Sequence, residues 1–142
     1  MLFRSITTDT LAPGEHVIAA YYEGDSVYLG LWSSVHTVQV NVNGTAVALT
    51  SSSATTTVGD DLTLYATVDP SGGTPLTGPT GLVYFFDSST NTWLGSATLD
   101  SGVATFTTDT LGVGTHIIVA YYAGDSVFDV SWSDPLTQTV VA

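Results

Sequence analysis

The chain repeats part of its own sequence at a spacing of about 100 residues, and this repeat sets the size of the folding unit. The segment TTDTLAPGEHVIAAYYEGDSV, beginning at Thr7, aligns without a gap with TTDTLGVGTHIIVAYYAGDSV, beginning at Thr107. Over the whole overlap of residues 6–42 with residues 106–142, roughly half of the paired positions are identical. A chain of 142 residues holds such a unit only once in full. We therefore predict a complete module in residues 43–142, preceded in residues 1–42 by the C-terminal part of another.

The complete unit has the pattern of successive short β-strands. Apolar and polar residues alternate from Leu62 to Val68, and the turn-forming segment DPSGG follows at Asp69 to Gly73. The nearly continuous apolar run GLVYFFD at Gly81 to Asp87 predicts a second strand. Further strands are predicted at Thr45 to Ser52, Trp93 to Leu99, Val103 to Thr108, His116 to Gly124 and from Trp132 onward. Seven short strands without an amphipathic helical period predict an all-β fold, an antiparallel β-sandwich.

The partial unit is predicted to contain the last three strands of a sandwich, near Phe3 to Asp9, His16 to Glu23 and Trp32 to Val42. The join NVNG at Asn41 to Gly44 is too short for a flexible tether, so we expect adjacent modules to have restricted freedom. Met1 to Ser5 fall outside the repeat, and both a non-native origin and divergence at the chain end would explain them.

Composition excludes several classes of function. The chain has 13 acidic residues against one Lys or Arg, and a net charge of −12. It therefore lacks the cations that bind nucleic acid by neutralising phosphates. Because it has no Cys, it has no disulfide, thiolate metal site or cysteine nucleophile. No apolar run reaches the roughly 18 residues of a membrane span.

Several motifs taken together resemble the bacterial Ig-like domain of group 3. They are LYATVDPSGGTPLTGPTGLVYFFD, GVATF, GTH followed by alternating apolar residues, Y-x-GD and PLTQTV, and the resemblance covers nearly all of Thr45 to Val140. It implies an Ig-like β-sandwich that occurs in tandem in large secreted or cell-surface proteins, without cofactor or catalytic residues. The partners it implies are neighbouring Ig-like modules, with surface glycans or host ligands reached through other domains. One departure is that Trp32 and Trp132 replace a small polar residue.

The His and Tyr residues of the repeat are predicted to hold the fold together. His16 and His116 share one repeat position at the start of a strand, where we expect one ring nitrogen to bond to the backbone. Metal binding and catalysis are the alternatives for these two residues, but no spaced Ser-His-Asp motif accompanies them. Tyr22 and Tyr122 lie near the end of the same strand, where a phenol can reach backbone across the sandwich. We predict that the chain is not an enzyme.

The acidic residues of the turns allow two interpretations. An aspartate in the turn GDSV, such as Asp125, is expected to accept backbone N–H bonds in an Asx-turn. Alternatively, alternating strand directions place Asp69, Asp100 and Asp125 at one pole of the complete module, facing Asp9 and Glu15 at the exit pole of its predecessor. Ca²⁺ takes six to eight oxygen ligands and would stiffen such a joint. No DxDxDG-type loop supports this calcium hypothesis.

One strand face is apolar where an outward face is normally polar. Its residues are Ile117, Val119 and Tyr121. The pattern indicates either β-branched propensity on a solvated sheet or lateral contact with another module or chain.

Two functions from different classes follow from these observations. The first is a structural spacer or stalk module of an extracellular adhesin-like repeat protein. The second is a carbohydrate-binding or accessory module of a secreted hydrolase, in which Trp93, Trp32 or Trp132 would stack on sugar rings. Exposure separates them, because co-planar exposed Trp rings on one sheet favour sugar binding and buried rings exclude it.

Overall fold

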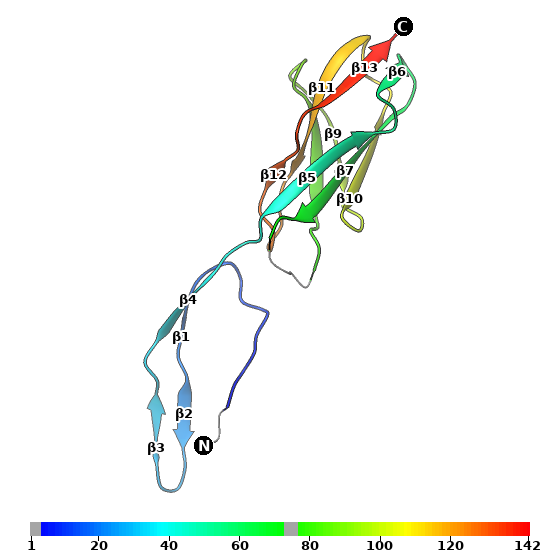
Figure 1. Ribbon diagram of the computed structural model, residues 1–142. Helices are drawn as coiled ribbons and strands as arrows, with labels where there is room; N and C mark the ends of the chain where they lie inside the picture. Colours follow the sequence, from blue (N-terminus) through cyan, green and yellow to red (C-terminus); the bar gives the residue numbers. More distant parts are fainter. Residues whose placement is uncertain (1–3, 73–76) are drawn as a thin grey trace. The chain divides into compact units, whose positions relative to one another are not determined.

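The structure, a computed structural model, describes residues 4–72 and 77–142 (Figure 1). The chain divides into two compact units, Met1–Val42 and Asn43–Ala142, which are called unit 1 and unit 2 below. Within the described residues every regular element is a β-strand, which confirms the predicted all-β class.

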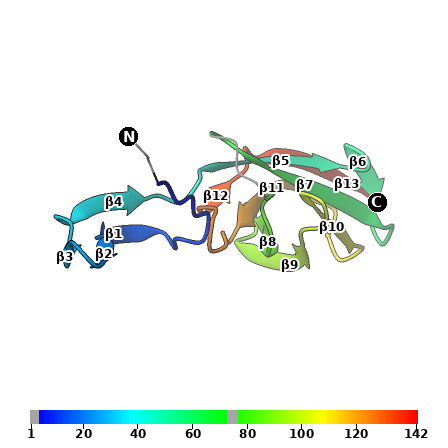
Figure 2. The ribbon, with the colours of Figure 1, turned by 90° about the horizontal axis from the view of Figure 1, so that it is seen from below.

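Unit 2 is a sandwich of two sheets (Figures 1 and 2). Its strands are β5 (Thr45–Ser51), β6 (Thr55–Thr57), β7 (Leu62–Pro70), β8 (Leu82–Asp87), β9 (Thr92–Thr98), β10 (Val103–Thr108), β11 (Gly114–Tyr122), β12 (Ser131–Trp132) and β13 (Leu136–Val141). The smaller sheet has the order β10-β7-β5, and the larger has the order β6-β13-β11-β8-β9 with β12 paired to β11. Neighbouring strands are antiparallel except β6 and β13. The predicted antiparallel β-sandwich is confirmed.

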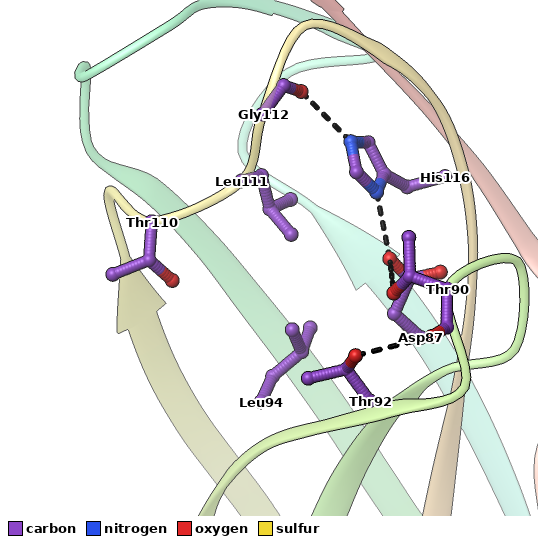
Figure 3. Close-up of a pocket in the computed structure, with 8 residues that line it drawn as sticks. All are labelled: Asp87, Thr90, Thr92, Leu94, Thr110, Leu111, Gly112 and His116. Carbon is purple, nitrogen blue, oxygen red and sulfur yellow. Dashed lines mark hydrogen bonds and ion pairs between the residues drawn. The ribbon is translucent and has the colours of Figure 1, made fainter.

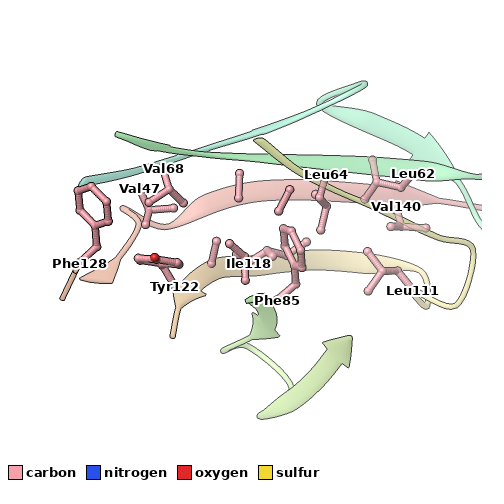
Figure 4. Close-up of a cluster of buried hydrophobic side chains, with 14 residues drawn as sticks. Val47, Leu62, Leu64, Val68, Phe85, Leu111, Ile118, Tyr122, Phe128 and Val140 are labelled. Carbon is pink, nitrogen blue, oxygen red and sulfur yellow. The ribbon is translucent and has the colours of Figure 1, made fainter. Parts of the chain in front are cut away.

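The core of unit 2 lies between the two sheets (Figure 4). Alternate residues of β7, from Leu62 to Val68, point into it and are almost fully buried. From the larger sheet come Phe85 and Tyr122, which together with Phe128 are the largest buried side chains. Burying an apolar side chain of this size contributes about 1.5–3 kcal/mol, so the alternation seen in the sequence accounts for the closure of the sandwich.

Two details of unit 2 depart from the predicted strands. The last predicted strand is divided into β12 and β13, because the Ser133 Oγ accepts the N–H of Ala120 at 2.9 Å where a ladder bond would continue. Pro135 then supplies no backbone N–H for pairing. The three-residue edge strand β6 was not predicted, because it is short and pairs with β13 only at the sheet edge.

Unit 1 contains four short strands, β1 (Gly14–Ile18), β2 (Tyr21–Gly24), β3 (Leu29–Trp32) and β4 (His36–Val40). They form two antiparallel pairs, β1 with β4 and β2 with β3. The prediction of a strand near Phe3 to Asp9 is wrong for its described part, since residues 4–9 form no strand, and Phe3 lies outside the described residues. The repeat counterpart of this segment is β10, which pairs with β7. Residues 6–42 align with residues 106–142, so unit 1 includes no counterpart of β7.

The strands β1 and β2 correspond to a single continuous strand, β11, in unit 2. The second half of β11, from Ile118 to Tyr122, pairs with β8, and unit 1 has no counterpart of β8 in its sequence. Ile118 and Tyr122 are 0% exposed, whereas the repeat-related Ile18 and Tyr22 are 43% and 49% exposed. Nearly the same sequence is therefore a buried core strand in one unit and an exposed hairpin in the other.

Candidate functional site

A polar pocket of about 250 Å³ opens near one end of unit 2 (Figure 3). It is lined by Asp87, Thr90, Thr92, Leu94, Thr110, Leu111, Gly112 and His116. Asp87 is the last residue of β8, and His116 lies on β11, which is paired with β8 in the larger sheet. Both side chains are buried, and buried titratable groups that line a pocket are candidates for a functional site.

Asp87 and His116 form a hydrogen-bonded ion pair. The His116 Nδ1 lies 2.7 Å from the Asp87 Oδ2, and the His116 Nε2 lies 2.8 Å from the carbonyl oxygen of Gly112. Both acceptors are oxygens, so both bonds form together only when each ring nitrogen carries a proton. The carboxylate also accepts bonds from the Ser89 N–H and Oγ and from the Thr90 Oγ1. His116 is thus held as an imidazolium against a carboxylate.

The surroundings shift the pKa of both groups toward their charged forms. Burial alone would raise the pKa of Asp87, but bonds from Ser89, His116 and Thr90 outweigh burial and lower the pKa to about 2. Burial likewise opposes the charge on His116, and the bonds to Asp87 and Gly112 raise its pKa nonetheless. The carboxylate and both ring nitrogens are fully occupied by the chain itself. Neither group is free to act as a general base.

The repeat counterpart of His116 makes only one of its two hydrogen bonds. In unit 1 the His16 Nε2 lies 2.6 Å from the carbonyl oxygen of Ala12, as in the bond from His116 to Gly112. Asp87 has no counterpart there, because the sequence of unit 1 lacks β8. The sequence pattern anticipated a backbone partner for the histidine, whereas Asp87 was not identified. Its only signal was a carboxylate at the end of an apolar strand.

A second polar contact fixes the opposite end of β11. The Tyr122 phenol donates to the carbonyl oxygen of Thr80 at 2.8 Å, and the Thr80 N–H and Oγ1 donate to the Asp125 Oδ2 at 2.9 and 2.8 Å. The Asp125 Oδ1 accepts the N–H groups of Val127 and Phe128, each at 2.8 Å. Burial raises the pKa of Asp125, but these bonds reverse the effect and lower it to about 2. Burial and the charge of Asp125 raise the pKa of Tyr122 to about 12.

Unit 1 shows the same tyrosine and aspartate without the intervening threonine. The Tyr22 phenol donates directly to the Asp25 Oδ2 at 2.8 Å, while the Asp25 Oδ1 accepts the N–H groups of Val27 and Tyr28. The Asx-type turn is the same in both units, so the two units differ at this contact only in the presence of Thr80. Thr80 precedes β8 and inserts between the phenol and the carboxylate, which ties β8 to the end of β11.

The acidic residues considered as calcium ligands are spread over both units. Asp69, Asp100 and Asp125 lie at one end of unit 2, where β7 and β11 end and β10 begins. Asp9 and Glu15 belong to unit 1. In the part of the chain that the structure describes, no three His, Cys, Asp or Glu side chains are grouped so as to hold a metal ion. The calcium joint therefore stays a prediction.

The outer side of the larger sheet carries five aromatic side chains, which are called the aromatic face below. They are Tyr84 and Phe86 on β8, Trp93 on β9, Tyr121 on β11 and Trp132 on β12. Trp93 and Trp132 are 56% and 53% exposed. An open cavity of about 440 Å³ lies against Tyr84, Trp93 and Tyr121.

The rings of the aromatic face contact one another across four strands. Ring centroids are 4.6 Å apart between Tyr121 and Trp132 and 6.4 Å apart between Trp93 and Trp132. Phe86 and Trp93 are 4.8 Å apart, and Tyr84 lies 6.1 Å from Trp93. The sequence singled out Tyr121 and the two Trp residues separately. Tyr84 and Phe86 were missed, because the apolar run of β8 conceals which of its residues point outward.

The residues predicted as a contact face lie on this same side of the sheet. Ile117 and Val119 are half-buried, since β13 and β8 flank β11 on either side. Their exposed area continues the aromatic face beyond Tyr121. Lateral contact through these three residues stays a prediction.

Comparison with known proteins identifies one family. Residues 49–141 match the family model described as bacterial Ig-like domain (group 3). No curated protein sequence matches the chain. Among the described residues there is no helix of the length and apolarity that a membrane crossing needs.

Proposed function

Because the chain belongs to the bacterial Ig-like domain family (group 3), we propose that it is a structural spacer module of a large secreted or cell-surface repeat protein. Domains of this family are generally non-catalytic and typically occur in extracellular or surface proteins. In this proposal the chain works outside the cell within an adhesin-like array. Its main partners are neighbouring Ig-like modules, and its role is to hold a binding or anchoring domain at a distance.

The observation that carries this proposal is that the same sequence segment occurs twice in the chain, once in each unit. In unit 2 the repeated segment packs with β5, β7, β8 and β10 into a complete sandwich. Two of its polar side chains are hydrogen-bonded within the unit, His116 to Asp87 and Asp125 to Thr80. In unit 1 the counterparts of the buried positions are half-buried or exposed. A sequence that recurs with its core pattern intact serves to build the same sandwich again.

The topology of unit 2 suits transmission of tension. The chain enters at β5, whose start pairs with the end of β7, and leaves from β13, whose end pairs with β6 at the other end of the sandwich. Force applied at Asn43 and Ala142 therefore acts along the strands. The nine residues of β11 correspond to a module length of about 30 Å. The net charge of −12 keeps neighbouring molecules apart.

An extended chain tests the proposal. Residues 43–105 would be placed directly before Ile6, which restores the repeat register in front of unit 1 and leaves out Arg4, whose repeat counterpart Ala104 is fully buried. We expect two sandwiches in place of one, with Tyr22 bonded to the Thr80 of the added copy. Tyr22→Phe should then lower the free energy of unfolding by about 1 kcal/mol in the extended chain and leave it unchanged in the present chain.

The control is Tyr122→Phe, which should destabilise both chains equally. The proposal fails if the extended chain shows no additional cooperative unfolding of unit 1 in urea. It also fails if Tyr22→Phe is without effect in the extended chain while the control destabilises as expected.

A further inference from the structure

The aromatic face lies on the side of the larger sheet that points away from the core. Tyr84 and Phe86 alternate along β8 with the buried Val83 and Phe85, so they point away from the smaller sheet. A sheet face toward solvent is normally polar. We propose that the aromatic face binds a neutral glycan, whose sugar rings stack on Trp93 and Trp132.

The rings of the aromatic face turn gradually from one strand to the next. The planes of Tyr84 and Tyr121, of Tyr121 and Trp132, and of Trp93 and Trp132 are tilted by only 35° or 36° from one another. These tilts add up along the series Tyr84, Tyr121, Trp132 and Trp93, so the rings form a curved platform whose two end rings, Tyr84 and Trp93, stand at 79° to each other. The C–H face of a sugar ring packs on such a platform, while the phenol O–H and indole N–H groups supply hydrogen bonds for its hydroxyls.

Charge selects the chemical class of the glycan. The open cavity at the aromatic face is lined by the uncharged residues Tyr84, Trp93 and Tyr121, and the whole chain has a net charge of −12. A polyanionic glycan is repelled by this charge, and so is a second copy of the chain. A cationic ligand is attracted, but cation binding by aromatic residues uses ring faces directed at one point from several sides. Only the pair of Tyr84 and Trp93 approaches that arrangement.

Unit 1 supplies an independent observation. Tyr21 and Trp32, the repeat counterparts of Tyr121 and Trp132, also contact each other, with centroids 4.8 Å apart. The two pairs occupy the same register on adjacent strands. The pair therefore forms with or without the rest of the sandwich, and it is not a by-product of core packing. Trp93 and Tyr84 complete the platform only in unit 2.

Affinity gel electrophoresis of the full chain tests the proposal. The probes are three uncharged polysaccharides, namely mixed-linkage β-glucan, galactomannan and soluble starch, each cast into a native gel. All proteins carry Trp32→Ala, so that the pair in unit 1 does not contribute. We expect retardation by at least one polysaccharide, and a loss of apparent affinity of at least about tenfold in Trp93→Ala and Trp132→Ala.

The matched control is Tyr65→Ala. Tyr65 is an exposed aromatic residue on β7 of the smaller sheet, so its removal should leave retardation unchanged. Thermal unfolding of each variant shows whether it is folded. Trp93→Phe keeps a ring at this position and should retain part of the retardation. Quenching of tryptophan fluorescence by the retarding polysaccharide gives a second readout without a substitution at the platform.

Four outcomes would overturn the proposal. Absence of retardation by all three polysaccharides is the first, and equal retardation of the parent, Trp93→Ala and Trp132→Ala is the second. The third is tight binding of tetramethylammonium without polysaccharide binding, which would identify a cation site. The fourth is a dimer in sedimentation velocity that Trp93→Ala dissociates, again without polysaccharide binding, which would identify a contact between copies.

Discussion

The ion pair of Asp87 and His116 should make the stability of unit 2 depend on pH, and Asp87→Asn should remove much of that dependence. Asp87 is 1% exposed, and its pKa is lowered from 3.8 to about 2. A shift of this size corresponds to about 2 kcal/mol of stability at a pH where the carboxylate is charged. The same hydrogen bond shifts the pKa of both Asp87 and His116, so the contribution of His116 is not added to this value of about 2 kcal/mol.

The direction of the dependence follows from the two shifts. Since the pKa of Asp87 is lower in the folded state, its contribution is present above pH 3.8 and is lost as the pH falls toward 2. Since the pKa of His116 is raised above 6.5, its contribution is present below pH 6.5 and is lost as the pH rises through the folded-state value. We therefore expect the largest contribution between about pH 4 and 6.5.

Urea unfolding followed by tryptophan fluorescence measures this effect. At pH 5 Asp87→Asn should lower the free energy of unfolding by about 2 kcal/mol, and the difference from the natural sequence should shrink toward pH 2 and toward pH 9. Part of the acid sensitivity will remain, because the pKa of Asp125 is also lowered to about 2. His16→Ala, which removes the half-buried histidine of unit 1, is the control and should change nothing. A difference between the two proteins that is constant from pH 2 to 9 would refute the reasoning.

Three further substitutions test the packing. Tyr122→Phe should lower the free energy of unfolding by about 1 kcal/mol by removing a buried bond, and Tyr22→Phe should leave it unchanged; equal effects in urea unfolding would contradict this. Gln138→Val should raise the melting temperature, because the buried Gln138 Oε1 lacks a partner and the repeat has Val at this position; a lower melting temperature argues against it. Gly95→Ala should destabilise unit 2 by about 1–3 kcal/mol, because a Cβ there would lie 2.5 Å from the Phe106 ring, and calorimetry showing no loss would exclude that clash.

The fold of unit 2 was predictable where a strand carries its own pattern. The alternation of β7 and the bounds of β10, Val103–Thr108, follow from local sequence, because side chains point alternately to the two faces of a sheet. The strands of unit 1 were predicted less well, because whether a strand runs without a break depends on the neighbouring strands that pair with it. In unit 2 β11 is one continuous strand, and β8 pairs with its second half. In unit 1 the corresponding segment is divided at Ala19 and Ala20 into β1 and β2.

The candidate sites were predictable only in part, because their members come from distant positions. His116 and Tyr122 were recognised from the repeat, but Asp87 and Thr80 are brought to them by the pairing of β8 with β11. The aromatic face depends likewise on the order of β12, β11, β8 and β9 in the sheet. A periodic pattern shows which side a residue faces, but the neighbours on that side depend on strand order.

Single-molecule stretching between the two termini tests the central claim, that unit 2 is a closed module able to carry tension. We expect one cooperative unfolding event with a gain in contour length of about 300 Å, the extended length of Thr45 to Val141 less its folded length. Unit 1, whose strands form exposed hairpins, should lengthen at low force without an event of comparable size. A gradual extension with no cooperative event would contradict the spacer role, as would an event much shorter than this length.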